Sequence, residues 1–151
     1  SSREPAYEVI RHDSNVHSIK DIPTGIISAA FFEEDALNET IISCSPAMLM
    51  YSTDNQTMTL SVANPDLAMY EGPSDEVFDP EGRRIERSVY GRDWIDNPCS
   101  PTTITVVLAG IWDIINNNGS DVTVSNEYGA TKLTFRSMEA RTEEITIRKI
   151  L

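Results

Sequence analysis

Apolar and polar residues alternate with a period of two along much of the chain. The clearest example is the run Thr-Met-Thr-Leu-Ser-Val at residues 57–62. The same spacing recurs in three later pairs: Val122 with Val124, Leu133 with Phe135, and Ile145 with Ile147. Successive side chains of a strand point to opposite faces, so this pattern places the apolar side chains on one face. We predict half-buried antiparallel strands in these segments.

Two other stretches, residues 25–32 and 102–109, are more uniformly apolar and β-branched. Such runs are typical of central strands that are covered on both faces, which is the prediction for these two. Shorter strands are expected at residues 7–11, 16–20, 39–43 and 47–52. Val, Ile and Thr together number 38, against 17 for Ala and Leu, and this ratio favours strands over helices.

The breaks between these runs contain residues that favour turns. They are Asp13-Ser14-Asn15, Asp54-Asn55-Gln56 and Asn116-Asn117-Asn118-Gly119-Ser120. Asn, Asp and Gly tolerate positive φ or close Asx turns, so we interpret all three as hairpin tips. About ten short strands without an amphipathic helical stretch predict an all-β fold, an antiparallel β-sandwich.

Residues 64–101 do not fit the strand pattern. This segment contains five prolines and three glycines: Pro65, Pro73, Pro80, Pro98, Pro101, Gly72, Gly82 and Gly91. We predict one long Pro/Gly-rich loop region. Long connections inside compact domains are usually functional or dock on another surface.

The chain is short and acidic. Its 151 residues predict one domain, and 12 basic against 24 acidic residues give a formal net charge of -12. Nucleic-acid affinity depends mainly on basic residues, so a nucleic-acid partner is not expected. No stretch approaches 18 uninterrupted apolar residues, and no membrane partner is expected either.

Residues that could carry chemistry are few. His12 and His17 are the two histidines, neither lies in a metal-ligand spacing, and both are interpreted as structural or surface residues. Hydrolase elbows and nucleotide-binding glycine motifs are absent from the sequence, so we assign no catalytic residue and no metal site. Cys44 and Cys99 fit either one disulfide or two buried free thiols.

An acidic run lies inside the long loop region. Its members are Glu71, Asp75, Glu76, Asp79 and Glu81, with no basic residue between them. Clustered carboxylates suit calcium, but the spacing is not that of an EF-hand, and a solvated loop is the commoner meaning of such a run. No cofactor is therefore assigned, and calcium remains the alternative.

A basic and aromatic cluster follows the acidic run. It consists of Arg83, Arg84, Arg87, Tyr90, Arg92 and Trp94. Arginine pairs well with carboxylate and sulfate, and aromatic faces stack on sugars, so these residues are the candidate carbohydrate-binding site for an acidic glycan. In the alternative interpretation, the arginines pair with the preceding acids or dock the loop on another domain.

The same part of the chain resembles a known family. Residues 59–76, TLSVANPDLAMYEGPSDE, and residues 84–90, RIERSVY, resemble the C-terminal part of bacterial chondroitin sulfate ABC lyases. These enzymes belong to the polysaccharide lyase family that also includes hyaluronate and chondroitin AC lyases. Residues 16–21 and 24–32 look like strands leading into that terminal domain, and the similarity extends from about Tyr7 to Lys149.

The resemblance implies that residues 1–151 form the single C-terminal β-sandwich domain of a larger lyase, with residues 1–20 as a candidate connection from its central β domain. It implies a secreted or periplasmic bacterial enzyme that cleaves uronate-containing polysaccharide by β-elimination. The family's catalytic groups lie in upstream domains, so this chain alone is expected to be inactive and to support the central domain. The upstream domains are then its partners, with acidic polysaccharide as a further candidate.

Two other functions remain open from the sequence. An autonomous carbohydrate-binding module is favoured by the basic and aromatic cluster. A structural or adhesive sandwich domain without any glycan role fits the strand pattern equally well. The acidic surface favours a supporting domain, because a sulfated substrate would be repelled by most of it.

Overall fold

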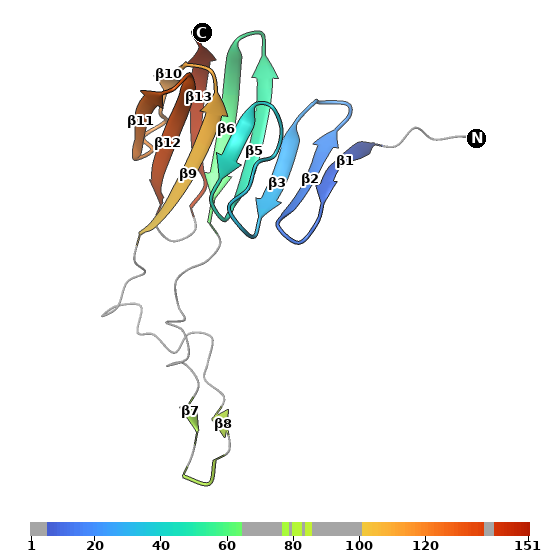
Figure 1. Ribbon diagram of the computed structural model, residues 1–151, viewed down its shortest axis with the longest axis vertical. Coiled ribbons are helices and arrows are strands. Elements are labelled where there is room, and N and C mark those ends of the chain that lie inside the picture. The colour runs from blue at the N-terminus through green and yellow to red at the C-terminus, as the bar shows by residue number, and fades with distance from the viewer. Residues whose placement is uncertain (1–5, 65–76, 79, 83, 86–100, 138–140) are drawn as a thin grey trace, which may run out of the picture.

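The computed structural model describes residues 6–64, 77–78, 80–82, 84–85, 101–137 and 141–151 (Figure 1). All regular secondary structure in these ranges is β-structure, and none of the described residues forms a helix that could cross a bilayer. Every strand pair is antiparallel. The predicted all-β sandwich is confirmed.

The larger of the two main sheets has seven strands. Their order across the sheet is β1 (Tyr7–His12), β2 (Val16–Asp21), β3 (Ile27–Phe31), β5 (Ala47–Asp54), β6 (Thr57–Ala63), β13 (Glu143–Lys149) and β10 (Trp112–Asn116). The last strand of the chain, β13, therefore lies inside the sheet between β6 and β10. Its pairing joins residues 57–62 to residues 143–148.

The smaller main sheet has four strands, in the order β11 (Val122–Glu127), β12 (Ala130–Ser137), β9 (Thr102–Ala109) and β4 (Ile41–Cys44). It packs against one part of the larger sheet, and β1 to β3 extend beyond it (Figure 1). Two further strands, β7 (Val77–Phe78) and β8 (Arg84–Ile85), pair with each other within the Pro/Gly-rich region.

Three details differ from the sequence predictions. The strands at residues 25–32 and 102–109 are central in their sheets, as β3 and β9, but each buries only one face. Their other faces are mostly half-buried, because none of the described residues forms a second layer over them. Residues 116–120 are not a hairpin tip, since they join β10 of the larger sheet to β11 of the smaller one. Strand β10 itself was not predicted.

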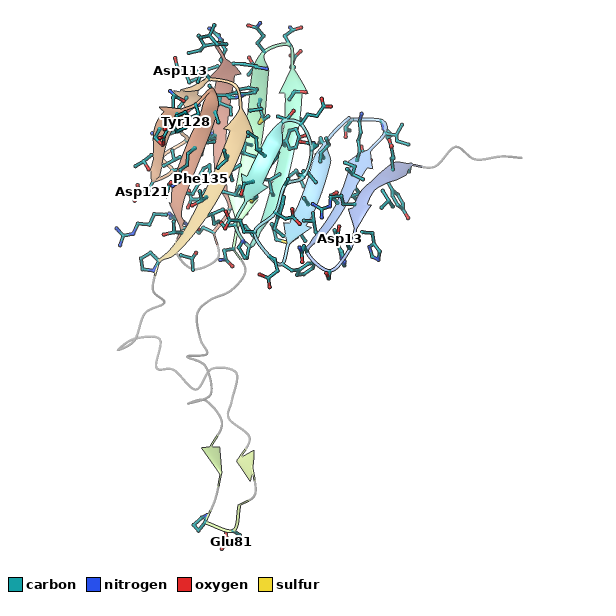
Figure 2. All side chains as sticks on the ribbon, viewed as in Figure 1. Asp13, Glu81, Asp113, Asp121, Tyr128 and Phe135 are labelled. Carbon is teal, nitrogen blue, oxygen red and sulfur yellow. The ribbon has the colours of Figure 1, made fainter. Side chains whose placement is uncertain are left out.

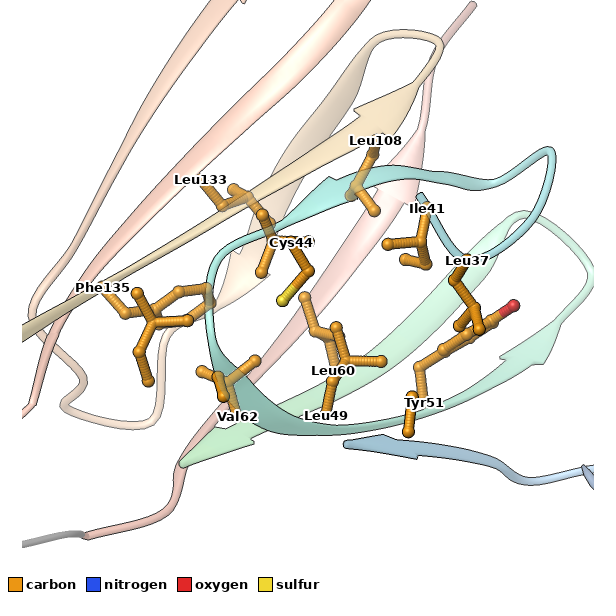
Figure 3. Close-up of a cluster of buried hydrophobic side chains, with 14 of the residues drawn as sticks. Leu37, Ile41, Cys44, Leu49, Tyr51, Leu60, Val62, Leu108, Leu133 and Phe135 are labelled. Atoms are coloured by element: carbon orange, nitrogen blue, oxygen red, sulfur yellow. The ribbon is translucent and has the colours of Figure 1, made fainter. Parts of the chain in front are cut away.

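The core lies between the two sheets (Figure 3). Alternate residues of β6, β9 and β12 point into it, as the period-two pattern predicted. The fully buried side chains include Leu60, Leu108, Leu133 and Phe135, and Cys44 is buried among them as a free thiol. Burial raises the pKa of the Cys44 thiol to about 12, so this cysteine is inert toward oxidants and metals at neutral pH.

A buried hydroxyl ties the smaller sheet to the crossover into β10. Thr131 of β12 is fully buried, and its Oγ1 accepts a hydrogen bond from the backbone N–H of Trp112 at 2.9 Å. The single proton of this hydroxyl has two acceptors within reach, the carbonyl oxygen of Gly110 at 2.8 Å and Oδ1 of Asn126 at 2.9 Å. Gly110 has a φ of +88°, and a Cβ there would lie 2.8 Å from the carbonyl oxygen of Leu151. The crossover therefore needs glycine at this position.

The segment that follows β3 contacts the hairpin of β1 and β2 through Asp35 and Ala36. Asp13, in the turn between β1 and β2 (Figure 2), accepts hydrogen bonds from the backbone N–H groups of Asn15 and Val16. Arg11 donates to Asp13 at 2.7 Å and to Asp35 at 3.1 Å. These contacts hold the turn between β1 and β2 against the segment at residues 33–40.

Low pH should weaken the contact between Arg11 and Asp35 and lower the stability of the fold. The hydrogen bond from Arg11 is the main cause that holds the pKa of Asp35 at about 2, below its ordinary value of 3.8. A carboxyl group with a lowered pKa in the folded state stabilises the fold above its unfolded pKa, and that contribution disappears as the pH falls through the folded pKa. In urea titrations, wild type should be more stable than Asp35→Asn at pH 7, and the difference should shrink between about pH 4 and pH 2. A difference that is unchanged at pH 2 would contradict this assignment.

Candidate interaction face

Most of the predicted carbohydrate-binding cluster lies outside the described residues. This holds for Arg83, Arg87, Tyr90, Arg92 and Trp94, whereas the backbone of Arg84 lies in β8. Glu71, Asp75, Glu76 and Asp79 of the acidic run are also outside, and Glu81 lies in the turn between β7 and β8. Both sites therefore stay predictions. Among the residues that are described, no three His, Cys, Asp or Glu side chains gather as a metal site.

The two histidines face each other across β1 and β2. His12 pairs directly with His17, and their rings stack with centroids 4.4 Å apart and planes 26° apart. Phe32 meets the His17 ring edge-on, with a centroid separation of 5.0 Å. Both histidines are exposed, as the sequence analysis predicted for surface residues. The three rings form an aromatic corner on the outer face of the larger sheet.

The register of the larger sheet aligns apolar side chains into rows on this outer face. One row runs across the strands as Val9, Ile19, Ser28, Met50 and Ser61. The next row is His12, His17, Ala30, Met48 and Ala63. Directly opposed residues of antiparallel strands point to the same face, so each row is continuous across the sheet.

The large apolar members of these rows remain in contact with solvent. Val9 is 57% exposed, Ile19 42%, Met48 50% and Met50 47%. We call these four residues, together with Tyr7 and Phe32, the apolar face. Single exposed apolar residues are normal on proteins, whereas a contiguous group usually marks an interaction site.

Small residues between the large ones create grooves on the apolar face. Ser28 and Ala30 lie between the ridges formed by β2 and β5, and a shallow groove of about 280 Å³ lies over them. A second groove, of about 260 Å³, adjoins it and extends from Ser28 past Met48 and Met50 to Ser61 and Ala63. The face therefore offers two adjoining grooves for apolar side chains.

The outer face of the larger sheet carries few carboxylates over β1, β2, β3, β5 and β6, and it becomes charged over β13 and β10. On the outer face of β1, β2, β3, β5 and β6, the carboxylates are those of Asp21, which pairs with Tyr7, and Asp54, which pairs with Thr57, and both lie at strand ends. Beyond β6, the outer face becomes polar with Glu144 and Arg148 of β13 and Asp113 of β10. Although the whole chain has a net charge of -12, the apolar face has no carboxylate at its centre. Such a surface is suited to burial against a partner.

Comparison with known proteins gives a consistent set of relatives. Residues 8–68 match the family described as polysaccharide lyase family 8, C-terminal beta-sandwich domain. The chain is 36% identical over 155 residues to the chondroitin sulfate ABC exolyase of Bacteroides thetaiotaomicron, an alignment that covers 98% of this chain and 15% of that enzyme. The chondroitin sulfate ABC exolyase of Proteus vulgaris is 37% identical over 118 residues, with 76% of this chain and 12% of the enzyme covered.

The fold has a counterpart among solved structures. The chondroitin AC lyase of Streptomyces coelicolor A3, solved in complex with chondroitin sulphate, aligns with a TM-score of 0.58 and 11% sequence identity. The alignment covers 96% of this chain and 15% of that enzyme. The chain thus spans about 15% of the length of the larger proteins that it matches.

Proposed function

This chain belongs to polysaccharide lyase family 8 as its C-terminal β-sandwich domain, and from this membership we propose that it is a noncatalytic supporting domain of a chondroitin sulfate lyase. The parent enzyme would cleave its uronate-containing substrate by β-elimination. The observation that carries this proposal is the 36% identity to a named chondroitin sulfate ABC exolyase across 98% of the chain.

The described residues support a noncatalytic role. Elimination at a uronate requires a group that neutralises the carboxylate and a positioned base and acid for the protons. His12 and His17 stack on each other at the surface, and Arg11 is engaged by Asp13 and Asp35. These three residues line the shallow groove over Ser28 and Ala30, and no described Tyr, Asn, Asp or Glu side chain lines it with them. The excess of acidic residues would also repel a polyanionic substrate.

An activity assay tests this proposal. The isolated 151-residue chain should release no unsaturated uronate product from chondroitin sulfate, whereas the complete lyase that carries it should release this product continuously. Absorbance of the conjugated double bond in the ultraviolet measures both reactions. Turnover by the isolated chain would overturn the noncatalytic role, and an inactive complete protein would overturn the lyase assignment.

A carbohydrate-binding module is the second candidate, and the basic and aromatic cluster in the sequence favours it. Calorimetry of the chain with sulfated chondroitin oligosaccharides separates it from the supporting role. A glycan-binding domain should give measurable heat that is lost in a variant carrying Arg87→Ala, Arg92→Ala and Trp94→Ala. Binding that survives these three substitutions would show that the cluster is not the glycan-binding site.

The proposal also places the protein outside the cytoplasm, as a secreted or periplasmic bacterial enzyme. A polymeric, highly charged glycan does not cross a bilayer unaided, so a lyase must meet it outside the inner membrane. Fractionation of the producing bacterium, followed by detection of the protein in the periplasm or the medium, tests this location. Detection in the cytoplasm alone would contradict it.

A further inference from the structure

We propose that the apolar face of β1, β2, β3 and β5 docks against another domain of the same lyase polypeptide. This inference rests on the proposed function, because it requires a parent lyase with further domains. It goes beyond that function by naming the docking surface and the chemistry of the partner. The partner must present an uncharged, apolar surface that fits the two grooves beside Met48 and Met50.

The first argument is that the described residues leave the outer face of this part of the sheet uncovered. Residues 47–51 are Ala-Met-Leu-Met-Tyr, so both faces of β5 are apolar. Ala47, Leu49 and Tyr51 are buried in the core, whereas Met48 and Met50 are about half exposed on the other side. Strands that are apolar on both faces are normally covered on both faces. The described residues supply the inner cover and do not supply the outer one.

The second argument identifies the source of that cover. The aligned segment is 15% of the Bacteroides thetaiotaomicron exolyase, so most of that relative lies outside the part that this domain matches. Strand β1 is the outermost strand of the sheet on this side and carries Tyr7 and Val9 of the apolar face. Polypeptide that precedes β1 would therefore join the domain at the border of the face. A domain tethered there has a high effective concentration at the face.

The third argument concerns charge and excludes the substrate as the occupant. Sulfate and carboxylate groups are held by Arg and Lys side chains. Arg11 contributes to the lining of the first groove, but its guanidinium bonds to Asp13, Asp35 and the carbonyl of Ala36. The rows across the face hold apolar, small and imidazole side chains. Such rows match an apolar protein surface and do not match a sulfated glycan.

Methionine oxidation measures whether the face is covered. In the isolated chain, dilute hydrogen peroxide should oxidise Met48 and Met50 quickly and the fully buried Met58 slowly, because access controls the reaction. In the complete lyase, oxidation of Met48 and Met50 should be at least about tenfold slower, with Met58 as the internal reference. Equal rates for Met48 and Met50 in the isolated chain and in the complete, active lyase would overturn the proposal.

Two matched lysine substitutions locate the docking surface. Ile19 on the apolar face and Ile42 on β4 of the smaller sheet are exposed to nearly the same extent, 42% and 43%. In the complete lyase, Ile19→Lys should restore fast oxidation of Met48 and Met50, since it places an unpaired charge in the interface. Ile42→Lys should leave both methionines protected. The same result for the two variants would overturn the assignment to this face.

Sedimentation of the isolated chain tests whether a second copy of this chain covers the apolar face. The proposal requires a monomer with reactive Met48 and Met50. A dimer in which these methionines are protected would assign the face to a second copy and overturn the docking on a lyase domain. Failure of the lyase assay is a separate outcome, because it refers to turnover by the complete protein and not to the accessibility of these residues.

Discussion

Replacement of Phe135 by alanine should lower the free energy of unfolding by about 3 to 5 kcal/mol. Phe135 is fully buried on β12 and belongs to the cluster between the two sheets, with Val62 and Leu133 (Figure 3). The substitution removes a whole aromatic ring and leaves a cavity that the surrounding strands cannot close, because both sheets hold their positions through hydrogen-bonded ladders. Urea unfolding followed by circular dichroism measures the change.

Phe32→Ala is the matched control for this experiment. Phe32 is 54% exposed, and its ring contact is with His17 on the outer face. In the isolated chain, its removal should therefore cost less than about 1 kcal/mol. If the two alanine variants lose similar stability, the two-sheet core is not the main source of the stability of this domain.

Replacement of Thr131 by valine should cost about 2 to 4 kcal/mol, although the two side chains have nearly the same shape. Valine cannot accept the hydrogen bond from the Trp112 N–H or donate one to the Gly110 carbonyl. A buried polar group without a partner costs about 1 to 3 kcal/mol, and this substitution leaves the buried Trp112 N–H and the half-buried Gly110 carbonyl without the threonine hydroxyl. The same urea titration measures the loss.

Thr131→Ser separates the hydroxyl from the methyl group. Serine keeps the hydroxyl and removes one buried methyl, so we expect a loss of only about 1 kcal/mol. An equal loss in the serine and valine variants would mean that packing of the methyl group, and not the hydrogen bonds to the crossover, accounts for the effect of Thr131.

The strands of the core could be predicted from the sequence because each has one face in the core and one outside it. β6 and β12 follow the period-two pattern along their whole length. β10 could not be found in this way. Its pairing with β13 is irregular between Ile114 and Asn116, and the extra residue there breaks the alternation on which the prediction depends. The asparagines that follow reinforced the interpretation as a turn.

The apolar face was not predicted, although part of its signal is in the sequence. Uniform apolarity at residues 25–32 suggested cover on both faces, and the structure provides it on one face only. Strand register decides that Ile19, Ser28 and Met50 lie side by side, and register depends on pairings between distant segments. The basic and aromatic cluster could be found in the sequence because its members are neighbours along the chain.

The position of β13 has a consequence for how the domain is made. Residues 143–149 fill the place between β6 and β10, so the larger sheet is split into two parts until that strand is inserted. During synthesis, nearly the whole domain must leave the ribosome before β6 gains its second neighbour. The unpaired edge of β6 is exposed throughout that interval, and unpaired edges promote association between nascent chains. Folding of this domain is therefore completed only after residues 143–149 have left the ribosome, and a chain that ends before them keeps the edge of β6 unpaired and prone to aggregation.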